Sequence, residues 1–244
     1  MSTEAEPSRL LIESAKELCA ELKGLRFSKP VTHTYNPLTY AWATHEEYLR
    51  RYGNTRKRVV FVGMNPGPFG MAQTGVPFGE INAVRNWLKI HAPIGKPDRE
   101  HPKRPVVGFD CKRSEVSGLR LWGLFAGRFE TAEEFFREHF VANYCPLCFY
   151  ETSGCNRTPD KLPARERAPV VAACDRHLAR IIDALGPEWV IAIGDFAEKR
   201  LHSVLGKRPP KIGKILHPSP ASPAANDNWA AKATAQLRAL GVWR

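Results

Sequence analysis

The sequence lacks any run of about 18 consecutive apolar residues, the length a helix needs to cross a bilayer. It also lacks the phosphate-binding patterns GxxxxGK[ST] and GxGxxG, so nothing in it indicates a common nucleotide-binding loop. Its first residues, MSTEAEPSRL, are polar and acidic, unlike the basic and then apolar start of a secretory signal. We therefore expect a soluble protein that is neither exported nor inserted into a membrane.

Acidic residues are scarce relative to basic ones. The 25 Asp and Glu residues face 36 Lys and Arg residues, which gives a formal net charge of +11. Such an excess is typical of proteins whose partners carry phosphates, with nucleic acid the first candidate and an anionic membrane surface the alternative. At 244 residues with 43% hydrophobic side chains, the chain is long and apolar enough to form a full core. Without repeats or a linker-like segment, we expect one domain over residues 1–244.

The six cysteines follow no regular spacing, and several lie within apolar segments where a free thiol behaves as a small hydrophobic residue. This pattern favours a reducing compartment. Cys145 and Cys148 form a CxxC motif, so a redox protein is one alternative. An iron–sulfur cluster that also uses Cys155 is another, but no convincing fourth ligand accompanies these three. We expect neither a metal nor another cofactor.

Four short apolar segments predict strands buried on both faces, at 58–63, 140–144, 189–194 and 211–216. Helical patterns lie between them, the clearest over 168–185, where apolar residues recur at intervals of three and four. This alternation predicts an α/β fold, a three-layer α/β/α sandwich around a four-stranded parallel sheet. We expect a further amphipathic helix over 8–27 to dock on this domain, and the stretch KPVTHTYNPLTYAW to be irregular.

In an open parallel sheet, ligands bind beyond the carboxyl ends of the strands. The segment after the first strand, GMNPGPFGMAQTGVPFGE, holds five glycines and three prolines in 18 residues, which favours a fixed loop that presents Asn65. Asn143 ends the second strand, and its amide offers one acceptor and two donors, which match the N3–H and O4 edge of uracil. His217 opens the rigid HPSPASPAAN loop. Taken singly, each feature has a structural alternative. The segment that carries Asn65 could be an ordinary strand-to-helix turn, and Asn143 could be a turn or cap residue. A lone histidine such as His217 is more often a surface or hydrogen-bonded residue, and a lone Phe78 more often fills the core.

These segments, together with EHPKRPVVGFDCKRSEVSG, closely resemble the single-strand-selective monofunctional uracil-DNA glycosylases, a branch of the uracil-DNA glycosylase superfamily. The similarity runs from about Tyr52 to the C-terminal helix. It implies an α/β/α fold and a DNA repair enzyme that acts on single-stranded or double-stranded DNA. We also expect a monomer, because a single domain that acts on one base needs no partner, located in the cytoplasm and nucleoid of a bacterium or in the nucleus of a eukaryote. The alternative is a catalytically inactive or differently specific nucleic-acid-binding protein of the same fold.

The resemblance also implies a role for each matching residue. Asn65 would position the attacking water, and His217 would support the departing base. Phe78 would stack on the flipped base, and Asn143 would read its pairing edge. The residues implied to border the base pocket are Met64, Gly67 and Met71. Because Gly67 replaces a bulky side chain that excludes 5-methyl groups in many relatives, 5-substituted uracils such as 5-hydroxymethyluracil are also expected substrates.

The expected contacts with DNA lie around these loops, at Ser219, Pro220, Ala221, Asn226, Lys103 and Arg104. Ala221 departs from the family pattern, because many relatives carry there an arginine that wedges into the duplex. Lys112, Arg113 and Arg120 are further candidates for phosphate contacts. No catalytic lysine stands at the matched motif positions, so we expect hydrolysis that leaves an abasic site, without a Schiff base or strand cleavage.

Overall fold

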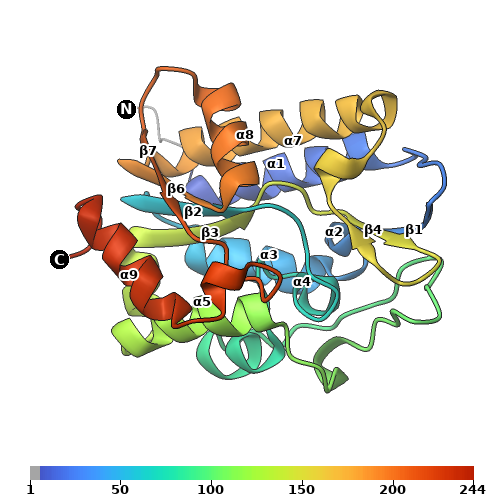
Figure 1. Cartoon of the computed structure of the whole chain (residues 1–244), viewed down its shortest axis with the longest axis horizontal. Coiled ribbons are helices and arrows are strands. Elements are labelled where there is room, and N and C mark those ends of the chain that lie inside the picture. Colours follow the sequence, from blue (N-terminus) through green and yellow to red (C-terminus); the bar gives the residue numbers. More distant parts are fainter. Residues whose placement is uncertain (1–5) are drawn as a thin grey trace.

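The computed structural model describes residues 6–244, so the first five residues of the polar N-terminal segment lie outside the described residues. A four-stranded parallel sheet runs through the centre of the molecule (Figure 1). Its strand order is β3-β2-β6-β7, with β3 at His139–Asn143, β2 at Val59–Gly63, β6 at Trp189–Ile193 and β7 at Lys211–Ile215. All four predicted strands are therefore present, within a residue of the expected ends.

Helices cover the sheet on both sides, as Figure 1 shows. Three lie above it in that view: α1 (Pro7–Leu22), α7 (Ala164–Leu185) and α8 (Asp195–Leu205). Below it lie α5 (Val116–Arg128) and α9 (Trp229–Ala239). The helix α3 (Trp42–Tyr52) packs beside the edge strand β3, where the Tyr48 hydroxyl donates to the Val141 carbonyl at 2.8 Å. The prediction of a three-layer α/β/α sandwich is confirmed.

Short elements connect these layers. The α-helical ones are α2 (Pro37–Tyr40), α4 (Met71–Thr74) and α6 (Ala132–Glu138), and a π-helical turn spans Ala83–Trp87. Turns of 3₁₀-helix span Gly108–Asp110, Pro159–Lys161 and Pro223–Ala225. Thr131 caps α6 as its sequence indicates, because its side chain accepts from the Glu134 N–H at 3.2 Å. Within residues 6–244, no helix is long and apolar enough to cross a membrane.

A second, antiparallel sheet joins β1 (Val31–Tyr35), β4 (Cys148–Glu151) and β5 (Asn156–Arg157) in that order. The interpretation of KPVTHTYNPLTYAW as irregular is therefore wrong, since it contains β1, α2 and the start of α3. The local pattern gave no sign of β1 because its partner lies far along the chain, with Tyr35 opposite Cys148. Sheet pairing of this kind depends on tertiary contacts more than on local propensity.

The N-terminal helix is shorter than predicted. It ends at Leu22 instead of Phe27, because Lys23 is extended and Gly24 has a φ of 87°. Its buried face lies against α7 and α3, and the Ser14 hydroxyl is hydrogen-bonded to the His177 ring at 2.7 Å. The helix α7 begins at Ala164 rather than Ala168.

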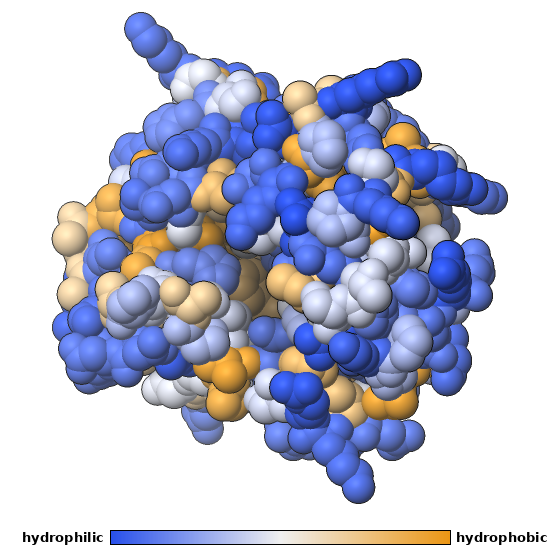
Figure 2. All heavy atoms as spheres, turned by 45° about the vertical axis from the view of Figure 1, so that its right-hand side comes forward, coloured by the Kyte–Doolittle hydropathy of each residue, from blue (hydrophilic) through white to orange (hydrophobic). Residues whose placement is uncertain are grey.

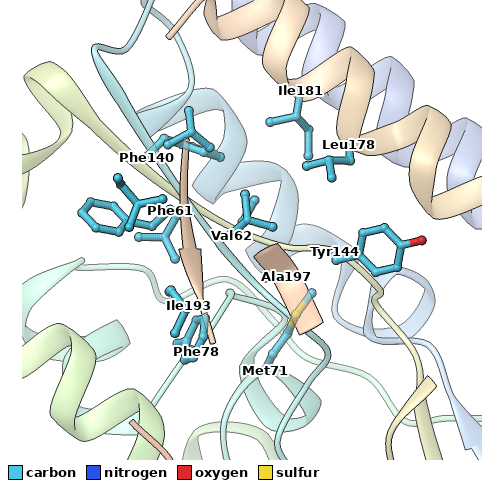
Figure 3. Close-up of a cluster of buried hydrophobic side chains, with 14 of the residues drawn as sticks. Phe61, Val62, Met71, Phe78, Phe140, Tyr144, Leu178, Ile181, Ile193 and Ala197 are labelled. Carbon is cyan, nitrogen blue, oxygen red and sulfur yellow. The ribbon is translucent and has the colours of Figure 1, made fainter. Parts of the chain in front are cut away.

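The main core lies between the sheet and its helices (Figure 3). It includes Phe61 and Val62 from β2, Phe140 from β3, Ile193 from β6, and Leu178 and Ile181 from α7. Met71 and Phe78 belong to the same cluster, although both follow β2 in the glycine-rich segment. The core thus fixes two of the expected base-binding residues.

Candidate active site

Phe78 and Asn143 meet over Gly63, the last residue of β2. Parallel pairing places Gly63 opposite Asn143 at the carboxyl ends of β2 and β3. A Cβ atom at position 63 would lie 2.4 Å from Cε2 of Phe78 and 2.6 Å from Oδ1 of Asn143. Only glycine permits so close an approach, and the structure therefore brings the proposed stacking ring and the proposed reading amide to one place.

The Asn143 amide is poorly satisfied within the protein. Its Oδ1 atom is buried without a hydrogen-bond partner in the described structure, and its Nδ2 donates to the Met71 sulfur at 3.2 Å. A buried polar atom without a partner costs about 1–3 kcal/mol, and a thioether is a weak acceptor. A ligand that offers an N–H beside a carbonyl oxygen would satisfy both ends of this amide.

The helix α5 holds the backbone of Phe78. Phe78 has a φ of 53°, a backbone conformation that residues other than glycine rarely adopt. Its carbonyl accepts from Nε1 of Trp122 at 3.1 Å and from the Glu80 N–H at 2.7 Å. Gly118 of α5 makes room for this carbonyl, because a Cβ atom there would lie 2.1 Å from the Phe78 oxygen. These contacts stabilise a strained conformation that directs the ring into the site.

His217 follows β7 and faces the same place. Its ring centroid lies 6.4 Å from that of Phe78. Burial lowers the pKa of His217, which favours the neutral imidazole at neutral pH. The Ser219 N–H donates to Nδ1 at 3.1 Å, so the proton of the neutral ring is on Nε2. His217 is therefore a neutral hydrogen-bond donor at the rim of the sheet.

Asn65 lies two residues beyond β2, in the proline-rich turn. Its Nδ2 donates to the Leu147 carbonyl at 3.2 Å, which fixes the amide plane and leaves Oδ1 as an acceptor. The preceding residue, Met64, is half-buried, and its carbonyl accepts from the Cys145 N–H at 2.8 Å. Backbone bonds between the segments after β2 and β3 thus place Asn65 near Asn143.

The proline-rich loop after His217 is held largely by its own hydrogen bonds. The Ser219 hydroxyl accepts from the Ala221 N–H at 3.2 Å, and Asn226 donates to the Pro220 carbonyl at 2.9 Å. Pro220, Ala221 and Asn226 are exposed. Three of the four proposed DNA contacts in this loop are thus open to a partner, while Ser219 is half-buried.

The two proposed basic contacts lie at a different edge of the site. Lys103 is exposed, whereas the Arg104 Nε donates to the Gly154 carbonyl at 2.7 Å. The guanidinium groups of Arg104 and Arg113 lie 5.3 and 3.9 Å from the ring centroid of Phe69, in the loop that follows Asn65. Figure 2, in which the right-hand side of Figure 1 is turned forward, shows a largely hydrophilic face around a central hollow with hydrophobic surface.

Comparison with known proteins places this chain in a family. The sequence model of the uracil-DNA glycosylase superfamily matches residues 50–238. Proteins called single-strand selective monofunctional uracil-DNA glycosylase, from Mus musculus and Rattus norvegicus, are 48% identical over 233 residues, which cover 95% of this chain and 84% of theirs. The chain belongs to this glycosylase family.

The fold of the glycosylase agrees with a solved structure, described as that of wild-type Pedobacter heparinus SMUG2. The two superpose with a TM-score of 0.69 over 98% of this chain and 100% of the other, at 19% sequence identity. At that identity the similarity concerns the fold alone. A Bos taurus relative with the same name as the rodent proteins is 48% identical over 91% of this chain and 82% of its own.

Glu115, which is not among the site residues expected from the sequence, lies directly against Gly67 in the glycosylase. A Cβ atom at position 67 would lie 2.2 Å from Oε2 of Glu115. The same oxygen accepts from the Phe69 N–H at 3.2 Å, and burial raises the pKa of the carboxyl group. Its only sequence signal was its place in the SEVSG segment, one of those that resemble the family.

The cysteines of the glycosylase are free thiols in the structure. Cys145 and Cys148 are buried and Cys155 is exposed. Between Glu6 and Arg244, no group of three or more His, Cys, Asp or Glu residues is arranged to hold a metal ion.

Proposed function

We propose that this glycosylase removes uracil from DNA by hydrolysis of the N-glycosidic bond and leaves an abasic site for base excision repair. The observation that supports this most directly is the meeting of Phe78 and Asn143 over Gly63, with His217 beside them. A flat aromatic face next to an amide edge suits a pyrimidine that has left the base stack. The names of the relatives point to the same substrate.

Recognition follows from the two ends of the Asn143 amide. The unpartnered Oδ1 would accept from N3–H of uracil, and Nδ2 would exchange the Met71 sulfur for O4. Cytosine offers an unprotonated N3 and an amino group instead, so it would leave both ends mismatched. Phe78 would stack on the base while α5 holds its backbone.

Charge stabilisation is the proposed role of His217. When the bond to C1′ breaks, negative charge develops on uracil O2. A neutral imidazole with its proton on Nε2 can donate to that oxygen, and the contact strengthens as the charge grows. Removing one such preorganised donor typically lowers the rate by about 10²-fold to 10³-fold.

Asn65 orients the attacking water in this proposal. A side-chain amide does not titrate in the useful range, so it cannot act as a general base. Its Oδ1 can instead accept from a water molecule while Nδ2 stays on the Leu147 carbonyl. The departing base and the flanking phosphates would stabilise the sugar cation. The water oxygen then bonds to C1′, and the proton that it releases balances the negative charge of the departed uracil.

We extend the proposed substrate range to 5-substituted uracils. Gly67 itself carries no side chain, and the carboxyl group of Glu115 occupies the space beside it, so a 5-hydroxymethyl group that entered there would contact this carboxyl group. We infer that the protein acts as a monomer on single-stranded and double-stranded DNA, and in whichever compartment holds the genome. Lys103, Arg104 and the exposed tip of the loop around Ala221 would contact the strand.

Excision from uracil-containing oligonucleotides, followed by alkali cleavage at abasic sites, tests the proposal. Asn65→Ala should lower the single-turnover rate by about 10²-fold and leave the Kd for uracil DNA within several-fold, because the residue contacts water rather than phosphate. Asn82→Ala is the matched control, since this exposed asparagine has no side-chain cap hydrogen bond. Tight DNA binding by the wild type without any base release would instead identify an inactive binding protein.

A further inference from the structure

The first turns of α5 contact three separate segments of the candidate site. Glu115, just before the helix, accepts from the Phe69 N–H, and Trp122 donates to the Phe78 carbonyl. Arg120 lies between them in sequence and reaches the loop after β7. The segment SEVSG therefore leads into a helix that braces the loops of the site, although none of these three side chains has a role in the chemistry proposed above.

Arg120 makes two hydrogen bonds to the loop that carries His217. Its Nη1 donates to the Pro218 carbonyl at 3.0 Å, immediately after His217, and its Nη2 donates to Oδ1 of Asn226 at 3.1 Å. Asn226 in turn donates to the Pro220 carbonyl at 2.9 Å. One guanidinium thus ties the beginning of the loop to its end and both to α5.

The other bonds of this loop are mostly internal. The Ser222 N–H donates to the Ser219 carbonyl at 3.0 Å, and the Trp229 indole donates to the Leu216 carbonyl at 2.8 Å. The Ser222 bond shapes the turn, and the Trp229 bond anchors Leu216, the residue before His217. Arg120 donates the side-chain hydrogen bonds that join loop residues 216–226 to α5. The same helix also holds Phe78.

We propose that Arg120 is a positioning residue that sets His217 against Phe78, rather than a contact to DNA phosphates. The proposal rests on the function inferred for His217. It explains why an arginine suits this position, because a planar guanidinium presents two separate nitrogens to two acceptors in fixed directions, whereas lysine offers one nitrogen with freely rotating donors. Its effect on catalysis passes through the position of the imidazole, not through the charge of Arg120.

The two roles predict different results for Arg120→Ala and Arg120→Lys. A positioning role predicts about a tenfold slower single-turnover excision at saturating enzyme for both variants, since a misplaced donor stabilises the transition state less well. The Kd for DNA and its salt dependence should stay unchanged. A phosphate contact predicts the opposite: weaker binding by Arg120→Ala, a salt slope lower by about one, and near-normal behaviour of Arg120→Lys.

Three further variants sharpen this test. Asn226→Ala removes the second acceptor of Arg120, and the double variant Arg120→Ala/Asn226→Ala should be no slower than Arg120→Ala alone, because both belong to one arrangement. Arg137→Ala is the matched control for loss of positive charge. Arg137 is exposed on α6, which leads into the first residue of β3 at the opposite edge of the sheet, and this variant should excise at the wild-type rate.

A measurement without substrate separates this inference from the proposed function. Amide hydrogen exchange over 217–226 should be at least about tenfold faster in Arg120→Ala than in the wild type, while α5 remains protected. Unchanged exchange in the loop, or unchanged excision with a lower salt slope, would overturn the positioning role. If the wild type released no uracil, the proposed function would fail, and exchange would still decide whether Arg120 holds the loop.

Discussion

Gly63→Ala is the smallest change that should disable the site, since it adds one methyl group. The new Cβ atom would lie 2.4 and 2.5 Å from Cε2 and Cζ of Phe78, and 2.6 Å from Oδ1 of Asn143. Neither neighbour can move away easily. Phe78 is buried with its carbonyl held by Trp122, and Asn143 ends a strand paired along its length with β2.

The magnitude follows from these contacts. Carbon atoms pack at about 3.5–4.0 Å, so the ring must move by roughly 1 Å or more. A misplacement of about 1 Å in a catalytic arrangement can cost about 10²-fold in rate. Overpacking a well-packed core costs about 1–3 kcal/mol, which corresponds to a Tm lower by roughly 2–12 °C at this chain length.

Single-turnover excision and thermal unfolding, measured on the same preparation, test this reasoning. The matched controls are Gly123→Ala and Gly127→Ala on α5, where a Cβ atom would meet nothing within 4 Å. Because glycine is unfavourable within a helix, each control should be as stable as the wild type or more stable by up to about 1 kcal/mol. A Gly63→Ala variant with normal excision would refute the placement of Phe78 and Asn143 over Gly63.

Asn143→Asp should slow uracil excision by about 10²-fold and shift the ratio of uracil to cytosine release, because a carboxylate cannot donate to O4. An unaltered ratio would contradict the role of Asn143 in reading the base. Ala221→Arg should raise single-turnover rates on uracil paired with adenine more than on single strands, since a side chain in the vacated space offsets the cost of opening a pair. Burial lowers the pKa of His45 and His139 to about 4 and that of His177 to about 3. Unfolded histidines protonate near pH 6.5, so the free energy of unfolding should fall as the pH drops from 6.5 towards 4, by up to about 1.4 kcal/mol per pH unit for each; equal urea midpoints at pH 7 and pH 5 would contradict this.

The central sheet was predictable from the sequence because its signal is local. Strands buried on both faces are short apolar runs, and those at 58–63 and 189–194 are interrupted only at their ends. The antiparallel sheet was not predictable in the same way. The strand β1 has no apolar run, and it is a strand because Val31 and Tyr35 lie opposite Glu151 and Cys148 of β4.

In the candidate site, too, the features with a local sequence signal were predictable and those that depend on tertiary packing were not. Asn65, Asn143 and His217 could be selected as candidates because each lies at or just beyond the carboxyl end of a predicted strand, where a parallel sheet gathers its functional residues. The environment of each residue could not be predicted. Nothing in the sequence shows that Glu115 fills the space beside Gly67, since the two approach only after α5 has packed against the loop.

Arg120 illustrates why composition alone does not assign the role of a single residue. In a chain with a net charge of +11, an arginine near the site is reasonably interpreted as a phosphate contact. The structure instead gives its guanidinium two acceptors within the protein, the Pro218 carbonyl and the Asn226 side chain. A charge count describes the field around the molecule, whereas the role of one cation depends on which acceptors the fold places within its reach.

The distribution of contacts suggests how this fold keeps its chemistry aligned. The groups proposed to act on the base come from loops after different strands, and such loops are the most mobile parts of a domain. The same helix, α5, holds Phe78 through Trp122 and the His217 loop through Arg120. Because one rigid element fixes both, a small shift of α5 moves the stacking ring and the proton donor together, and their relative geometry is preserved.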